Sequence, residues 1–281
     1  MSEDILLDLA GARLAGKRWR NGARPVLALH GWLDNAASFD RLAPQLADAD
    51  VLALDLPGHG HSDHRPPQAS YNIWDDLPDI VRAADQLGWS RFHLLGHSRG
   101  AIMSALLAAA LPERVISVVM LDAVTPGPVP IDDTFVQLGK FLREHLYSKR
   151  GVARYESIDD ALLMRCKMAR MSETAARPIV ERGIAQRDGA WSWRADPRLH
   201  FASAFKLSDA HNRVLRRQLA QLPHLLLLAE RGGGRDLGDG AQFEGLRWEL
   251  LSGSHHFHME EEAALIAAKI ARFWRDLDQA Q

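Results

Sequence analysis

A serine between two glycines is the residue whose surroundings most clearly suggest covalent chemistry. The segment Gly96-His97-Ser98-Arg99-Gly100 follows an apolar run typical of a buried strand and precedes an alanine- and leucine-rich run typical of a helix. A serine at such a junction stands on a tight turn above the sheet, and small neighbours are needed because backbones crowd there. The start of the helix also favours negative charge that develops beside it. The pattern predicts that Ser98 is a nucleophile.

A serine hydroxyl attacks well only when a neighbouring base takes its proton. Three histidines late in the chain, His255, His256 and His258, lie between a predicted strand and the terminal helix. His255 comes first after the strand, so we predict it as the base, followed by His256 and then His258. No acidic or thiol residue stands at the usual metal-ligand spacing from these histidines, so we expect no metal site.

A carboxylate is also needed to orient the imidazole and to stabilise its protonated form. Asp122 directly ends an apolar strand, where a side chain can be held rigidly, whereas Glu230 ends a later strand and Asp236 lies behind three glycines. We rank Asp122 first, Glu230 second and Asp236 third. A capping role at the end of the strand is the alternative interpretation of Asp122.

Attack on a carbonyl creates an oxyanion that must be met by preorganised N–H groups. We expect these donors to be the backbone N–H groups of Arg99, directly after the nucleophile, and of Trp32, in a loop that follows an earlier strand. His30, just ahead of that loop, is better suited to a structural hydrogen bond. The Arg99 side chain either favours an acidic substrate or forms an ion pair, and both interpretations stay open.

Large aromatic residues suggest where a substrate would bind. We predict substrate contacts for Trp32, Arg99, Trp191 and Trp193. The aromatic side chains that could wall an apolar acyl pocket are Trp32, Trp191, Trp193, Phe201 and Phe205. Apart from Trp32, they are as well explained as the core of their own segment, because large aromatic side chains are usually buried wherever they occur.

Apolar runs separated by helical patterns indicate the elements that hold these residues. Strands are predicted over residues 25–30, 51–55, 92–96, 115–121, 225–228 and 247–251, and helices over 36–47, 72–87, 100–111 and 260–277. Strands without polar alternation, separated by helices, indicate a parallel sheet covered on both faces. Residues 131–215 have helical spacing and no clear strand. We therefore predict a core of residues 1–126 and 216–281, with a helical cap inserted over 127–215.

Composition excludes several classes of protein. The chain has 281 residues, of which 47% are hydrophobic and 25% charged, and its net charge of −2 gives no case for binding nucleic acid or an anionic membrane. No apolar run approaches the roughly 20 residues of a membrane span, and no signal peptide is visible. The single cysteine, Cys166, cannot form an internal disulfide. We expect a cytoplasmic globular protein whose partner is a small carbonyl-containing molecule, and make no prediction of its oligomeric state.

The order of the motifs resembles the α/β-hydrolase superfamily. The matching segments are His30-Gly-Trp, Asp55-Leu-Pro-Gly-His-Gly-His-Ser, Gly96-His-Ser-Arg-Gly and the late Ser-His255. Residues 30–39, 194–199 and 253–260 are similar to the kraken and serine-hydrolase-like subgroup. The resemblance implies a mostly parallel eight-stranded sheet flanked by helices, an inserted helical cap, no cofactor, and a triad of Ser98, an acid and His255.

Two departures from the family pattern bear on the chemistry. Gly232 stands where an Asp would be expected, which resembles haloalkane dehalogenases and favours Asp122 as the acid. Ser98 in place of an Asp nucleophile argues against dehalogenase and epoxide-hydrolase chemistry. The resemblance implies hydrolysis and names no substrate. We predict a serine hydrolase that acts by acyl-enzyme formation on a small or medium carboxylic ester. The alternatives are a C–C bond or lactone hydrolase with the same triad, and a non-catalytic ligand-binding member of the fold.

Overall fold

The strands predicted as flat apolar runs form one central sheet. The computed structural model describes residues 1–9, 11–232 and 243–280. The order across the eight-stranded sheet is β1-β2-β4-β3-β5-β6-β10-β11. The strands are β1 (Glu3–Leu9), β2 (Ala12–Arg20), β3 (Arg24–Leu29), β4 (Ala49–Leu54), β5 (Phe92–His97), β6 (Val115–Leu121), β10 (His224–Arg231) and β11 (Trp248–Ser254). The six strands from β4 to β11 are parallel, whereas β1 and β2 are antiparallel to their neighbours.

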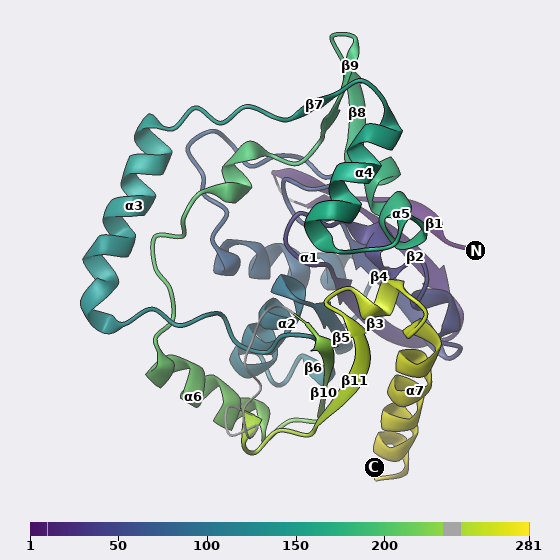
Figure 1. Ribbon diagram of the computed structural model, residues 1–281. Helices are drawn as coiled ribbons and strands as arrows, with labels where there is room; N and C mark the ends of the chain where they lie inside the picture. Colours follow the sequence, from purple (N-terminus) through teal and green to yellow (C-terminus); the bar gives the residue numbers. More distant parts are fainter. Residues whose placement is uncertain (10, 233–242, 281) are drawn as a thin grey trace.

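Each face of the sheet carries its own apolar core, which explains why the strands show no polar alternation. In β3, Leu27 and Leu29 belong to one core, and Val26 and Ala28 belong to the other. The first core is covered by α1 (Leu77–Gln86), α2 (Arg99–Ala110) and α6 (Asp209–Leu219), and the second by α7 (Ala263–Gln279). Figure 1 shows these helices on opposite sides of the sheet. The predicted fold class is confirmed.

The parallel arrangement gathers the predicted chemistry at one edge. The loops that carry Trp32, Ser98, Asp122 and His255 follow β3, β5, β6 and β11, respectively. Since these strands run in the same direction, their carboxyl ends meet at the same edge of the sheet, which is where open α/β sheets bind ligands.

Two predicted helices differ from the structure. Residues 36–47 form the short 3₁₀ helices η1 (Ala36–Phe39) and η2 (Ala43–Gln45) instead of one α-helix. Pro44 has no N–H to continue a helical ladder, so a single helix through this segment is disfavoured. The helix predicted over 72–87 is divided into η3 (Ile73–Asp76) and α1, with Pro78 near the start of α1.

The segment between β6 and β10 is a mixed α/β cap. It contains α3 (Thr134–Tyr147), α4 (Ile158–Ala169), α5 (Glu173–Gly183) and η5 (Pro197–His200) before α6. It also holds a small sheet of β7 (Arg154–Tyr155), β9 (Ala190–Trp193) and β8 (Ile184–Arg187), so the expectation of no strand here is wrong. The sequence does carry a signal, because Asp188-Gly189 forms a two-residue hairpin turn with positive φ at both residues. The predicted cap boundary at residue 215 falls inside α6, whose Leu215 and Leu219 pack on the core.

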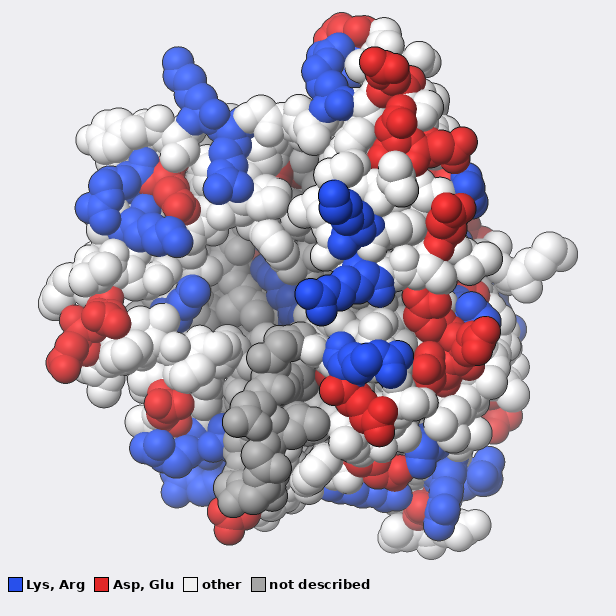
Figure 2. Space-filling view, viewed as in Figure 1, with Lys and Arg blue, Asp and Glu red and all other residues white. Residues whose placement is uncertain are grey.

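The outer surface is mixed in charge. Figure 2 shows basic and acidic side chains interspersed over the viewed face, in keeping with the net charge of −2. Within the described ranges, no helix has the length and hydrophobicity required to cross a membrane.

Candidate active site

The turn between β5 and α2 holds Ser98 in an uncommon backbone conformation. Ser98 has φ 51° and ψ −116°, and its N–H donates to the carbonyl of Leu121 at 2.9 Å. Gly96 and Gly100 are required on either side because there is no room for a side chain at these positions. A Cβ on Gly96 would lie 2.3 Å from the carbonyl oxygen of Gly100, and a Cβ on Gly100 would lie 1.9 Å from that of Leu29. The strand and helix thus approach so closely that the serine is forced onto the tip of the turn.

Three predicted residues from three strand ends meet in one chain of hydrogen bonds. The Oγ of Ser98 lies 2.9 Å from Nε2 of His255, and Nδ1 of His255 lies 2.5 Å from Oδ2 of Asp122. Asp122 is fully buried and also accepts a hydrogen bond from the N–H of Ala229 at 3.0 Å. In this arrangement Nδ1 donates to the carboxylate, and Nε2 is free to accept a proton from the serine.

The remaining candidates for base and acid lie elsewhere. Nε2 of His256 faces Asp34 at 3.4 Å, and His258 is fully buried, which lowers its pKa well below the usual value. Glu230 is exposed at the end of β10, and within the described ranges no hydrogen bond joins it to His255. Asp236 lies outside the described residues.

Gly232 explains how Asp122 reaches this position. A Cβ built on Gly232 would lie 2.4 Å from both carboxyl oxygens of Asp122. The carboxylate therefore occupies the space that any side chain at position 232 would need. The glycine and the buried aspartate are complementary in shape.

A buried histidine supports the loop that carries Trp32. His30 donates from Nδ1 to the carbonyl of Gly31 at 2.7 Å and accepts at Nε2 from the N–H of Leu56 at 3.0 Å. Burial lowers the pKa of His30 to about 4, so the ring is neutral at pH 7. The Trp32 indole donates to the carbonyl of Leu199 at 3.0 Å, which ties the loop to the cap.

The Arg99 side chain forms an ion pair. Its guanidinium lies 2.7 Å from the buried carboxylate of Asp76, which also pairs with Arg65 at 2.9 Å. Of the two interpretations left open for the Arg99 side chain, the ion pair is the one present in the structure. Arg99 still lines a cavity beside Trp32.

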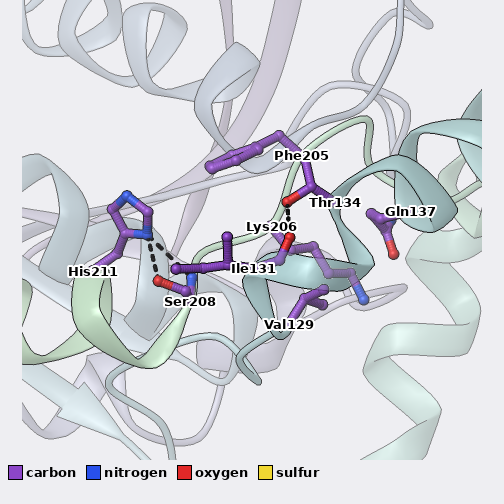
Figure 3. A pocket seen from close by; sticks show the side chains of 8 residues that line it. All are labelled: Val129, Ile131, Thr134, Gln137, Phe205, Lys206, Ser208 and His211. Atoms are coloured by element: carbon purple, nitrogen blue, oxygen red, sulfur yellow. Dashed lines mark hydrogen bonds between the residues drawn. The ribbon is translucent and has the colours of Figure 1, made fainter.

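Cavities lie on both sides of Trp32, whose side chain is 47% exposed. A cleft of about 940 Å³ contains Ser98, His255, Asp34 and the cap residues Arg165 and Met168. A second cavity of about 450 Å³ is lined by aromatic and basic groups, including Trp32, Trp74, Arg99, Lys140, Phe201 and Phe205. A small apolar pocket of about 150 Å³ shares Gln137, Phe205 and Lys206 with it, and Figure 3 shows this pocket.

Comparison with known proteins identifies the family. A family model described as the alpha/beta hydrolase fold matches residues 24–166. A serine hydrolase-like protein from Danio rerio is 33% identical over 243 residues, which are 82% of this chain and 73% of that protein. The chain belongs to the alpha/beta hydrolase family. The resemblance to its serine-hydrolase-like subgroup is confirmed.

Solved structures agree with the assignment of this chain to the alpha/beta hydrolase family. A hypothetical protein from Pseudomonas aeruginosa PAO1 superposes with a TM-score of 0.90 at 39% identity, covering 97% of this chain and 99% of that one. The thioesterase domain from the curacin biosynthetic pathway has a TM-score of 0.83 at 22% identity, covering 96% and 99%. The second similarity concerns the fold alone.

Trp191 and Trp193 do not lie where the α/β hydrolase would contact a substrate. Both pack against the apolar core of the cap, and the indole of Trp193 donates to the hydroxyl of Tyr155 at 3.1 Å. Neither residue lines the serine cleft or the cavity beside Trp32. Because both side chains pack within the cap and away from these two cavities, the geometry does not support the predicted substrate contacts.

The sequence analysis missed an ion pair beside the cleft. Asp34, after β3, pairs through Oδ1 with Arg165 of α4 in the cap. Beneath it, Nε2 of His97 donates to the carbonyl of His255 at 2.8 Å. Asp34 and Arg165 are 131 positions apart, and no local pattern links them.

The lowered pKa of His30 predicts how this α/β hydrolase responds to acid. A group whose pKa is lower in the folded chain binds protons more readily when unfolded, so acid favours unfolding. We expect the free energy of unfolding to decrease as pH falls from 6.5 towards about 4. His30→Gln should remove up to about 1.4 kcal/mol per pH unit of this slope. Urea denaturation across this pH range measures it, and an unchanged slope in the variant would contradict the prediction.

Proposed function

We propose that this α/β hydrolase cleaves a small or medium carboxylic ester through an acyl-enzyme intermediate on Ser98. The supporting observation is the continuous chain of hydrogen bonds from Ser98 through His255 to the buried Asp122. His255 removes the proton of the Ser98 hydroxyl as Oγ attacks the ester carbonyl, and then transfers this proton to the departing alcohol. Water attacks the acyl-enzyme in the same way, with His255 again as the base.

Asp122 stabilises the imidazolium that forms during both steps. Its carboxylate is fully buried, so it is screened little by solvent and interacts strongly with the charge on His255. The hydrogen bond to Nδ1 also keeps the tautomer in which Nε2 faces the serine.

Two backbone N–H groups stabilise the oxyanion in this mechanism. Arg99 is the first residue of α2, where N–H groups have no partner within the helix. Trp32 lines the same cleft as Ser98. Donors that are already oriented cost no reorganisation when the negative charge develops.

The acyl chain of the substrate is assigned to the cavity beside Trp32. This cavity is bounded by Arg99 at the nucleophile and by Phe201 and Phe205 from the cap, and it continues towards the small pocket of Figure 3. Apolar walls of this kind favour an aliphatic or aromatic acyl group. The larger cleft, which contains polar and charged side chains, is left for the alcohol and the attacking water.

Covalent labelling tests whether Ser98 is reactive. We expect a fluorophosphonate probe to modify the wild-type protein at Ser98, because the hydrogen bond to His255 activates Oγ. Ser98→Ala should abolish labelling and lower kcat on p-nitrophenyl esters by about 10⁶-fold. Intact-protein and peptide mass spectrometry measure the adduct. Absence of an adduct would favour a ligand-binding member of the fold, whereas labelling without turnover of any ester in a chain-length series would favour C–C bond or lactone hydrolysis.

A pair of isosteric substitutions tests the assignment of the acid. Asp122→Asn should lower kcat by about 10⁴-fold, since the tautomer and charge of His255 are no longer supported. Glu230→Gln is the matched control and should leave kcat within a few-fold, because Glu230 is exposed and outside the hydrogen-bonded chain. A loss confined to the Glu230 variant would reverse the assignment.

Gly232 provides an independent test in which no proposed catalytic residue is substituted. Gly232→Ala should displace the Asp122 carboxylate and lower kcat by about 10²-fold, the scale expected for a small misplacement at an active site. Gly151→Ala is the control, because nothing lies within 4 Å of a Cβ at that position. Steady-state kinetics with equal activity in both variants would contradict the proposed role of Asp122.

A further inference from the structure

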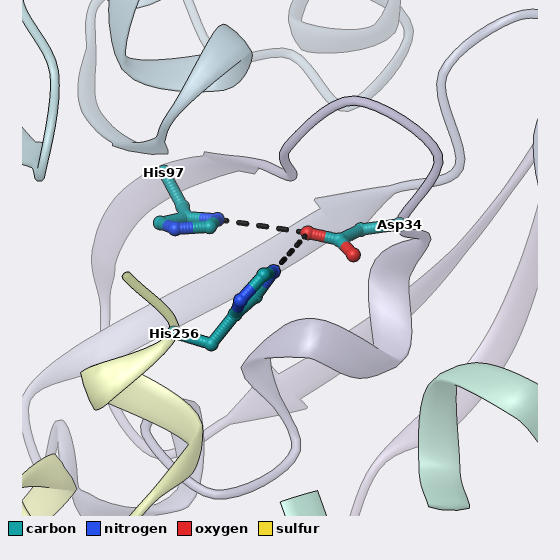
Figure 4. A group of neighbouring side chains, drawn as sticks. All are labelled: Asp34, His97 and His256. Atoms are coloured by element: carbon teal, nitrogen blue, oxygen red, sulfur yellow. Dashed lines mark ion pairs between the residues drawn. The ribbon is translucent and has the colours of Figure 1, made fainter. Parts of the chain in front are cut away.

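We propose that Asp34, His97 and His256 form a binding site for a divalent transition-metal ion, with Zn²⁺ as the model ligand, beside the serine cleft. The three side chains come from the ends of β3, β5 and β11 and converge on one point, as Figure 4 shows. Two imidazole nitrogens and one carboxylate oxygen are a donor set that suits Zn²⁺ and its neighbours. The sequence analysis considered only the late histidines and expected no metal.

The distances between the donor atoms suit a tetrahedral ion. Oδ2 of Asp34 lies 3.6 Å from Nδ1 of His97 and 3.4 Å from Nε2 of His256. One ligand atom from each residue lies within 4.8 Å of both others. Zinc bonds of about 2.0–2.1 Å place tetrahedral ligand atoms roughly 3.3–3.4 Å apart. Two of the three separations are therefore close to those required, and small side-chain rotations can close the third.

Two buried acceptor atoms, Nδ1 of His97 and Oδ2 of Asp34, face each other in this site. Nε2 of His97 donates to the carbonyl of His255, and a carbonyl can only accept, so the neutral ring has a bare lone pair on Nδ1. Across the described residues, neither this Nδ1 nor Oδ2 of Asp34 has a hydrogen-bond partner. A cation between these two buried acceptors would satisfy both.

The site also has room for an ion and is open to the cleft. A Cβ on Gly31 would lie 2.7 Å from Oδ2 of Asp34 and 3.0 Å from Nδ1 of His97, so the glycine keeps open the space between the donors. Asp34, His97 and His256 all line the cleft that contains Ser98. An ion can therefore enter from the cleft, and a water can complete its coordination from that side.

Arg165 orients the site and limits its affinity. Its guanidinium pairs with Oδ1 of Asp34, which leaves Oδ2 directed at the two histidines. A hydrogen-bonded partner of this kind commonly orients a metal-binding carboxylate. Its positive charge, however, opposes a second cation nearby. Arg165→Gln should therefore tighten Zn²⁺ binding, in contrast to loss of any of the three ligands.

Occupancy of this site would affect the proposed base. His97 holds the backbone carbonyl of His255, and His256 is the next residue in the chain. Coordination that rotates either ring would move His255 relative to Ser98. This consequence rests on the proposed function, whereas metal binding itself does not.

The test uses the full chain after treatment with EDTA and removal of the chelator. We expect Co²⁺ to bind at one ion per chain with the visible absorption bands of tetrahedral coordination, and Zn²⁺ to displace it in competition titrations. His256→Gln and Asp34→Asn should weaken Zn²⁺ binding by more than the about 100-fold that loss of an outer-shell contact can cost. Gly31→Ala should weaken it by filling the space. His64→Gln, at an exposed histidine outside the cleft, is the control and should bind as the wild type does.

Thermal unfolding in EDTA checks that each variant is folded. Zn²⁺ should raise the Tm of the wild type, of the His64→Gln control and of Arg165→Gln, and should not raise the Tm of the His256 and Asp34 variants. Absence of saturable binding at one ion per chain, or equal affinity in the wild type and His256→Gln, would overturn the metal site. Fluorophosphonate labelling of Ser98 should become at least several-fold slower when Zn²⁺ is bound. Unchanged labelling of a metal-saturated protein would overturn the coupling to His255, and the absorption titration does not depend on hydrolase activity.

Discussion

A buried carboxylate at the end of β6 joins the strand ends on which the candidate active site depends. Asp122 accepts a hydrogen bond from the backbone of Ala229 in β10 and contacts His255, which follows β11. An ionised group removed from water needs such partners to be stable. The bare backbone of Gly232 provides the space for the carboxylate. The need to give the Asp122 carboxylate hydrogen-bond partners therefore ties together the ends of β6, β10 and β11.

A second layer of polar groups lies directly behind this one. His97 supports the backbone of His255, and Asp34 faces both His97 and His256. Because these groups are buried, their protonation and partners decide how rigidly the candidate base is held. The same layer is the proposed metal site, so an ion there would act on the hydrolase through the residues that support His255.

The cap is attached to the core by charged and polar contacts as well as by apolar packing. Arg182 pairs with the buried Asp55 at 2.9 Å, and the amide of Asn35 donates to the carbonyl of Ile179 at 2.8 Å. Glu260, beside the late histidines, accepts two hydrogen bonds from Ser172 in the cap. Ser172 and Glu260 also line the cleft, so one of these contacts joins the cap to the core at the site itself. Specificity within this family depends on the shape that results.

The sequence by itself determined the parts that follow from local periodicity and turn chemistry. Flat apolar runs predicted six of the strands, and the glycines around Ser98 predicted its turn, because both patterns reflect the backbone within a few residues. The positions of His255 and Asp122 directly after strands were sufficient to nominate the residues that the structure brings together with Ser98.

Only the tertiary structure decided which distant groups meet. The contacts of Asp34 with His97, His256 and Arg165 depend on strand order and on how the cap docks. The packing of Trp191 and Trp193 depends on a small sheet within that cap. The residues next to a carboxylate or a histidine in the sequence do not indicate which distant group that side chain will contact. Their pairing is set by long-range packing, which a local pattern does not encode.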